Sequence, residues 1–125
     1  MTVRCLIVDD NDRFLQVAPV MLEREGIDVV GVAATSAEAI QRAGELRPDV
    51  ALADVDLGAE CGFDLAWWFA RAGSVERMDV IMISARDEAD YRDMIAVSPC
   101  LGYRPKTGLS GSAIRAKLEN AEPAD

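Results

Sequence analysis

Five short apolar runs alternate along this chain with segments of helical periodicity, and this alternation most limits its fold. The runs are rich in Val, Ile, Leu and Ala, as expected for strands that are buried on both faces. They cover residues 3–9, 27–33, 50–54, 80–84 and 101–104. Apolar residues at helical spacing predict helices over about 12–25, 36–46, 63–72, 87–97 and 110–118.

Strands that are separated by helices pair in parallel, because each connection is long enough to cross over the sheet. Such crossovers are right-handed, so few topologies remain. The sequence therefore predicts an α/β protein with a flavodoxin-like, doubly wound five-stranded parallel sheet of order 2-1-3-4-5 and five helices. Residues 1–120 are expected to form a single domain and residues 121–125 a frayed tail.

Local signals mark the ends of several elements. Pro19 is expected to weaken or kink the first helix. Thr35 and Glu38 have the spacing of a capping box, in which two side chains bond free backbone N–H groups at a helix start. A loop with Gly58 and Gly62 is expected between the third strand and the third helix.

The composition excludes several classes of function. Half of the 125 residues are hydrophobic, which suits one packed core. The net charge of -9 disfavours direct contact with nucleic acid or an anionic membrane. The chain has no histidine, which excludes histidine acid–base catalysis, histidine metal ligands and a Ser-His-Asp triad.

The expected location is the cytoplasm. No apolar run approaches the roughly 20 residues that cross a membrane, and the first residues lead into a strand rather than a signal peptide. Cys5, Cys61 and Cys100 are an odd number of cysteines without metal-binding spacing, so reduced thiols are expected. A regulatory thiol at Cys61 is the alternative.

Polar residues stand where four of the predicted strands end. Asp9 and Asp10 end the first strand, Asp54 the third and Ser84 the fourth, and Lys106 closely follows the fifth. The carboxyl ends of parallel strands share one edge of a sheet, where ligands bind. We therefore expect three carboxylates, one hydroxyl and one ammonium to meet in one cleft.

These groups suit a divalent cation and a phosphoryl group. Carboxylates and a backbone carbonyl, such as that of Asp56, are ligands for Mg²⁺. Asp54 can attack phosphorus to form an acyl phosphate, and crowding by Asp9 and Asp10 would raise its pKa when no metal is bound. Turn or capping roles for the Asp9-Asp10 pair, and a solvated loop position for Asp56, are the alternatives.

Ser84 and Lys106 complete the expected cleft. The Ser84 hydroxyl can hydrogen-bond a phosphoryl oxygen, and the Lys106 ammonium can pair with a carboxylate or a phosphoryl oxygen. Pro105 restricts the backbone before the lysine, and a rigid or cis turn there would aim the lysine inward. The ordinary alternatives are a helix cap or loop for Ser84 and a solvated surface position for Lys106.

Taken in order, these motifs resemble a known family. Asp9-Asp10, Asp54, Ser84 and the segment Tyr103-Arg104-Pro105-Lys106 are similar to the motifs of the receiver domain of two-component response regulators. The similarity covers residues 3 to about 118, as a single receiver domain. It implies phosphorelay signal transduction: a sensor histidine kinase or phosphotransfer protein would pass a phosphoryl group to this chain.

The resemblance also implies roles for the acidic residues. Asp54 would be the phosphoacceptor that becomes an aspartyl phosphate. Asp9 and Asp10 would be the acidic Mg²⁺ pair, with Asp10 and Asp54 as direct side-chain ligands and Asp56 contributing its backbone carbonyl. The chain would then be a phosphoprotein switch and not an enzyme, with only self-phosphorylation and self-dephosphorylation chemistry.

For the remaining motif residues the resemblance implies a switching mechanism. Ser84 would be the switch hydroxyl that is drawn toward the phosphoryl group, and Lys106 would pair with that group. Tyr103 would be the switch aromatic that turns inward on activation, with ordinary half-buried packing as the alternative. The output face would be residues 87–118, acting on a downstream effector or a fused output domain.

The sequence departs from the family pattern at four places. Gly58 stands where proline is usual, Cys61 where aspartate or serine is usual, Thr107 where proline usually follows the lysine, and Pro99-Cys100 where a Gly-Ala step is common on the output face. The first two predict a looser loop after the phosphoacceptor and a changed rate of dephosphorylation. The third leaves the backbone turn of Lys106 less constrained.

Two further hypotheses concern pairs of residues. Asp56 and Arg86, each two residues after a site residue, are expected to form an ion pair that restricts hydrolytic water. Trp67 and Trp68 are adjacent in the third helix and cannot face the same way. One core tryptophan and one partly exposed tryptophan are expected, with a partner or homodimer contact as the alternative.

Other functions remain open at this point. A haloacid-dehalogenase-like phosphatase would use Asp54 and Asp56 as its motif of two aspartates, although that motif follows the first strand in such enzymes. A flavodoxin-like module that binds FMN would need a phosphate cradle, which the acidic loop 10–13 lacks. A receiver that has lost phosphorylation is a further alternative, and the chain can be stand-alone or part of a longer regulator.

Overall fold

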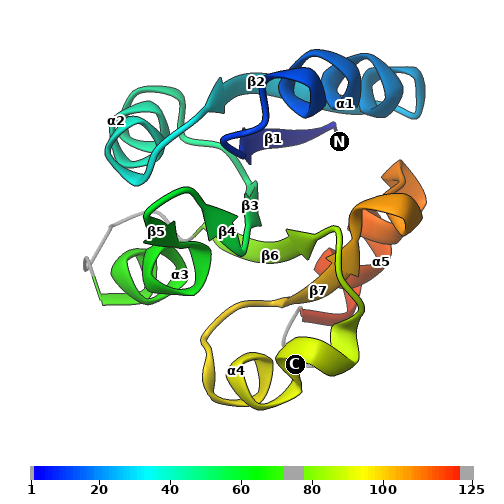
Figure 1. Cartoon of the computed structure of the whole chain (residues 1–125). Coiled ribbons are helices and arrows are strands. Elements are labelled where there is room, and N and C mark those ends of the chain that lie inside the picture. Colours follow the sequence, from blue (N-terminus) through cyan, green and yellow to red (C-terminus); the bar gives the residue numbers. More distant parts are fainter. Residues whose placement is uncertain (1, 72–77, 122–125) are drawn as a thin grey trace.

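A five-stranded parallel sheet forms the centre of the computed structural model, which describes residues 2–71 and 78–121. Its strand order is β2-β1-β3-β6-β7 (Figure 1). The bounds are β1 Val3–Val8, β2 Ile27–Ala33, β3 Val50–Asp54, β6 Asp79–Ser84 and β7 Gly102–Pro105. Counted along the chain, these five strands have the predicted order 2-1-3-4-5, so the doubly wound fold is confirmed.

Helices cover both faces of this sheet. They are α1 (Asp12–Arg24), α2 (Ser36–Leu46), α3 (Gly62–Arg71), α4 (Arg92–Val97) and α5 (Gly111–Ala121), with 3-10 turns η1 (Glu88–Tyr91) and η2 (Lys106–Gly108). None of the helices among the described residues has the length and apolar character needed to cross a membrane.

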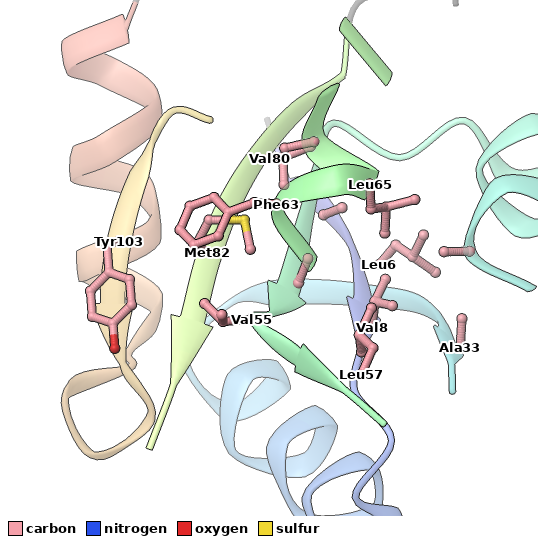
Figure 2. Packing of buried hydrophobic residues seen from close by; sticks show 14 residues of the cluster. Leu6, Val8, Ala33, Val55, Leu57, Phe63, Leu65, Val80, Met82 and Tyr103 are labelled. Carbon is pink, nitrogen blue, oxygen red and sulfur yellow. The ribbon is translucent and has the colours of Figure 1, made fainter. Parts of the chain in front are cut away.

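The hydrophobic core consists of two clusters, one on each face of the sheet. Neighbouring side chains of a strand point to opposite faces, so Leu6 and Val8 join one cluster while Cys5 and Ile7 join the other. The first cluster, drawn in Figure 2, packs against α2, α3 and α4. The second packs against α1 and α5. Strand β3 is buried along its whole length because both clusters cover it.

Two of the predicted helix signals, Thr35 with Glu38 and Pro19, lie at the start of α2 and within α1. The Glu38 N–H donates to Thr35 Oγ1 at 3.2 Å, and Glu38 Oε1 accepts the N–H of Ala34 at 3.1 Å. Half of the expected capping box is therefore formed: Thr35 accepts the N–H of Glu38, but the Glu38 carboxylate bonds the N–H of Ala34 and not that of Thr35. Helix α1 continues through Pro19 from Asp12 to Arg24, because its buried face, including Ala18 and Leu22, holds it on the sheet.

The structure corrects the prediction in the fourth helical segment and in the loop before α3. The single helix expected over 87–97 is divided into the 3-10 turn η1 and the short helix α4. The expected loop contains a small antiparallel pair, β4 (Asp56–Leu57) and β5 (Glu60–Cys61). The predicted end of the third helix at Ala72, with Gly73-Ser74, lies outside the described residues, as does most of the predicted frayed tail.

The expected core tryptophan is also wrong. Trp67 and Trp68 are 41% and 42% exposed, so neither is a core residue. The buried face of α3 is instead occupied by smaller residues and one phenylalanine: Gly62, Phe63, Leu65 and Ala66. Trp68 packs edge-on against Phe69, with 5.3 Å between the ring centres.

Candidate functional site

The sheet topology brings the strand ends together. Val8 lies opposite Ala53 in the parallel pair β1–β3, so the residues that follow, Asp9 and Asp54, emerge side by side. Asp54 is paired with Ile83, and Ser84 in turn is paired with Pro105, the residue before Lys106. The predicted site residues therefore share one edge of the sheet.

Asp9 is fully buried at the turn from β1 into α1. Its Oδ1 accepts the N–H of Asn11 at 2.9 Å, and its Oδ2 lies 2.7 Å from Lys106 Nζ. Asn11, and not an aspartate, caps α1: its side-chain oxygen accepts the N–H of Phe14 at 3.1 Å. The helix-cap alternative for the Asp9-Asp10 pair is therefore wrong. The turn alternative is found at Asp9, whose Oδ1 bonds the N–H two residues further on while its Oδ2 contacts Lys106.

Asp54 is 5% exposed and has partners for both carboxylate oxygens. Its Oδ2 lies 3.5 Å from Lys106 Nζ, and its Oδ1 accepts the N–H of Asp56 at 3.4 Å. Burial and the neighbouring negative charge of Asp9 raise the pKa of the Asp54 carboxyl to about 6, although Lys106 and the Asp56 N–H act in the opposite direction. Of the two neighbours expected to crowd Asp54, Asp9 raises its pKa, and Asp10 contributes an oxygen within 4.8 Å.

Three carboxylates form a group that suits a divalent cation. One oxygen each from Asp9, Asp10 and Asp54 lies within 4.8 Å of the other two. Two of the three residues are buried, and Asp10 is exposed. Hard oxygen donors of this kind match Mg²⁺, which keeps several waters beside one or two carboxylates. The side chain of Asp56 is exposed, and its carboxylate is not a member of this group.

Lys106 Nζ lies between the two buried carboxylates. Burial alone would lower the pKa of the ammonium, but the hydrogen bond to Asp9 and the charges of Asp54 and Asp9 outweigh it, so the pKa is raised. The ammonium also lies 4.6 Å from the centre of the Phe14 ring. No peptide bond among the described residues is cis, so the bond before Pro105 is trans.

Ser84 and Tyr103 meet at the backbone of Arg86. The Ser84 hydroxyl oxygen accepts the Arg86 N–H at 3.1 Å, and the Tyr103 hydroxyl donates to the Arg86 carbonyl. Tyr103 is buried, not half-buried. It lies in the cluster of Figure 2 with Phe63 and Met82, and its ring centre is 5.9 Å from that of Tyr91. Burial raises the pKa of Tyr103, with Ser84 opposing part of the change.

The proposed ion pair of Asp56 and Arg86 is not formed, although both residues lie in the described part of the chain. Both side chains are exposed, and an exposed pair contributes little to stability. The contacts of Arg86 in this region are made by its backbone, which bonds Ser84 and Tyr103.

The segment after Asp54 forms a small hairpin that was not expected from the sequence. Asp56 pairs with Cys61 and Leu57 with Glu60, and Gly58 turns the chain with φ +65. Glu60 Oε1 then accepts the N–H of Ser36 at the start of α2, at 3.0 Å. The available signal was the two-residue turn Gly58-Ala59, although the strands beside it are too short to show a pattern. The loop that was expected to be loose is therefore a hairpin that is hydrogen-bonded to α2.

Comparison with known proteins identifies this arrangement. Residues 5–105 match the family described as the response regulator receiver domain. The chain is 28% identical over 105 residues to response regulator GacA of Pseudomonas viridiflava, covering 83% of this chain and 48% of that protein. It is 45% identical over 58 residues to a protein-glutamate methylesterase/protein-glutamine glutaminase of Alkalilimnicola ehrlichii, covering 46% and 15%. The chain thus spans half or less of these curated relatives.

Solved structures agree on the fold. The signal receiver domain of a modulated diguanylate cyclase from Desulfovibrio desulfuricans G20 aligns with a TM-score of 0.77 at 30% identity, over 97% of this chain and 94% of that chain. Chemotaxis response regulator CheY4 of Vibrio cholerae has the same fold, with a TM-score of 0.76 at 19% identity over 96% and 98%. These matches give no support to a haloacid-dehalogenase-like phosphatase, and the Asp54-Val55-Asp56 motif follows β3 and not the first strand. The chain belongs to the response regulator receiver domain family.

Proposed function

We propose that this receiver domain accepts a phosphoryl group on Asp54 from a phosphohistidine of a sensor kinase or phosphotransfer protein, with Mg²⁺ bound beside it. The observation that carries the proposal is the convergence of groups on one buried carboxylate. Oxygens of Asp9 and Asp10 lie within 4.8 Å of an Asp54 oxygen, and Lys106 Nζ lies 3.5 Å from Asp54 Oδ2.

The transfer step uses the ionised carboxylate of Asp54. One of its oxygens attacks phosphorus, an O–P bond forms, and the N–P bond of the donor breaks with its electron pair returning to the imidazole. The carboxylates of Asp9, Asp10 and Asp54, with the carbonyl of Asp56, would hold Mg²⁺, which neutralises phosphoryl charge and favours the ionised form of Asp54. Lys106 remains as a second positive charge for the phosphoryl oxygens.

The switching step follows from the contacts of Ser84. Its oxygen accepts a hydrogen bond from Arg86, and a hydroxyl can also donate one, here to a phosphoryl oxygen on Asp54. Movement of Ser84 toward Asp54 would displace the backbone of Arg86, to which the Tyr103 hydroxyl is bonded. The change would then reach the face over residues 87–118, where Met94 and Val97 are exposed.

The receiver family is a signalling switch, and we propose that this chain acts in the cytoplasm without contacting nucleic acid or membrane itself. Its cysteines are free thiols, in keeping with a reducing compartment. Some relatives combine a receiver with other modules, such as a response regulator/sensory box/GGDEF 3-domain protein from Carboxydothermus hydrogenoformans. We propose that this receiver acts on a downstream effector or a fused output domain. A second copy of the chain could bind through Trp67 and Trp68, which are exposed.

The proposal is tested by incubation with Mg²⁺ and acetyl phosphate, followed by intact mass measurement. The wild-type protein should gain the mass of one phosphoryl group, and Asp54→Asn should not. Asp28→Asn, an exposed aspartate of β2, is the matched control and should behave as wild type. A protein that consumes the donor without holding an adduct would be a phosphatase, and an adduct on Asp54→Asn would place the acceptor elsewhere.

A further inference from the structure

One contact of the cleft involves a residue outside the polar motifs. Lys106 Nζ lies 4.6 Å from the centre of the Phe14 ring, within the roughly 6 Å over which an aromatic ring attracts a cation. Phe14 is in the first turn of α1 and packs against the core cluster on that face of the sheet. The partly buried ring therefore packs against the core on one side and lies beside the ammonium.

The backbone of Phe14 is also tied to the site. Its N–H donates a hydrogen bond to Asn11 Oδ1 at 3.1 Å, and the N–H of Asn11 donates to Asp9 Oδ1 at 2.9 Å. The same carboxylate of Asp9 pairs with Lys106 through its other oxygen, at 2.7 Å. Phe14 and Asp9 thus approach the ammonium from one short, hydrogen-bonded segment of chain.

The backbone around Lys106 provides less restraint. The lysine begins η2, a single 3-10 turn, and its carbonyl accepts one long hydrogen bond of 3.4 Å from Leu109. Thr107 follows it, so no proline fixes the turn on that side. A lysine side chain is flexible, and its ammonium is strongly hydrated. The position of Nζ therefore depends on the groups around it: Asp9, Asp54 and the Phe14 ring.

We infer that Phe14 is a positioning residue whose ring keeps the Lys106 ammonium beside the Asp54 carboxylate. The ring covers one side of Nζ, where water would otherwise compete with the carboxylates for its three N–H donors. Without the ring the ammonium gains water and rotamers, and it is less often in place to meet an incoming phosphoryl group. This inference rests on the proposed function, because it assigns a role in that reaction.

The test is a double-mutant cycle on the rate of adduct formation with acetyl phosphate and Mg²⁺. Phe14→Leu removes the ring but stays apolar, and it should slow the reaction about three- to tenfold, from the usual strength of a cation–π contact. Phe14→Tyr keeps the ring and should stay close to wild type. In a Lys106→Met background, Phe14→Leu should have no further effect, because a residue that acts through the lysine cannot act without it.

Leu15→Val is the control for packing. Leu15 contacts the same core cluster, and this variant should lose stability without slowing the reaction. If Phe14→Leu does not fold, Phe14→Met takes its place in the cycle. An unchanged rate in the ring-less variant would overturn the inference, and so would an equal slowing with and without Lys106.

A second readout separates this inference from the proposed function. In protein with ¹⁵N- and ¹³C-labelled lysine, the ring shifts the nuclear magnetic resonance signals of the Lys106 side-chain end and slows its motion. Phe14→Leu should shift these signals toward those of a solvated lysine, and Phe14→Tyr should retain them. Failure of the wild type to form any adduct would reject the proposed function. Identical Lys106 signals in wild type and Phe14→Leu would reject the inference alone.

Discussion

The Cβ atom that Gly62 lacks would lie 2.0 Å from the backbone carbonyl oxygen of Asp54. The Gly62 N–H donates to the Val55 carbonyl at 2.8 Å, so the start of α3 cannot move away without breaking that bond. Strand β3, which ends at Asp54, and helix α3 are therefore packed at a distance that only glycine allows.

Gly62→Ala should destabilise the protein by about 1–3 kcal/mol, the usual cost of forcing a methyl group into a packed site. Because the clash is with Asp54 itself, adduct formation should fall in the same variant. Urea unfolding and intact mass measure the two effects.

Gly44→Ala is the control for this substitution. Gly44 lies in α2 with no atom within 4 Å of an added Cβ, and alanine there should raise stability by about 0.5–1 kcal/mol through helix propensity. If the two alanine variants were equally stable relative to wild type, the close approach at Asp54 would not matter.

The raised pKa of Asp54 predicts an unusual dependence of stability on pH. Its pKa is about 6 in the folded protein and about 3.9 in an unfolded chain. Between these pH values the folded state binds more protons at Asp54. The contribution of Asp54 to the metal-free free energy of unfolding should therefore increase as pH falls from 7 to 4 and be lost as pH rises through 6. The usual carboxylate, with a lowered pKa, has the opposite sign.

This effect is measured by urea unfolding with a chelator present, at pH values from 7 to 4. Across that range, the titration of Asp54 should change the free energy of unfolding by about 1–2 kcal/mol, after allowance for partial solvent screening. Asp54→Asn removes the titrating group, so its curve should lack this contribution. A wild-type curve that matches the Asp54→Asn curve at every pH would show that Asp54 titrates normally.

The strand order and the position of the acidic site follow from patterns within single elements. Each central strand is a short apolar run, and each ends at a polar residue, so the parallel topology alone places Asp9, Asp54 and Ser84 at one edge. Predicting the strand order and the meeting of Asp9, Asp10 and Asp54 required no knowledge of contacts between distant residues. That is why these features could be predicted from the sequence.

The features that the sequence did not reveal depend on contacts between elements. Phe14 reads as an ordinary core residue of α1, and its approach to Lys106 appears only when α1 and η2 are placed together. The two-residue strands β4 and β5 are too short to have a periodic pattern. For Trp67 and Trp68, the missing information was which residues fill the buried face of α3.

Glu60 links the β4–β5 hairpin, which follows Asp54, to α2. Its Oε1 accepts the Ser36 N–H at 3.0 Å, at the helix end where a negative charge is favourable. Glu60→Ala should cost about 0.5–1 kcal/mol, and Glu60→Gln should cost less because its amide oxygen still accepts the hydrogen bond. Urea unfolding at low salt measures both.

Glu45 is the matched control, because it lies near the opposite end of the same helix. A negative charge is unfavourable there, so Glu45→Gln should be neutral or slightly stabilising. Helix-end electrostatics would be the wrong explanation if Glu60→Gln and Glu45→Gln changed stability in the same direction.

Substitutions of Asp9 and Asp10 should have different effects on Mg²⁺ binding and on stability. Asp10 is exposed and Asp9 is fully buried, yet both contribute to the carboxylate group. Asp10→Asn should weaken Mg²⁺ binding by about tenfold or more and leave metal-free stability unchanged or higher, because it removes repulsion from a crowded site. Calorimetric titration with Mg²⁺ and unfolding in chelator measure the two properties.

Asp9→Asn should lower both properties. It weakens Mg²⁺ binding in the same way, and it also removes the partner that lies 2.7 Å from Lys106 Nζ. The cost should be about 1–3 kcal/mol, below the full cost of breaking a buried ion pair, because Asp54 remains 3.5 Å from the ammonium. Added Mg²⁺ should stabilise the wild type more than it stabilises Asp9→Asn or Asp10→Asn. If Mg²⁺ stabilised all three proteins equally, the ion would bind at a different place in the structure.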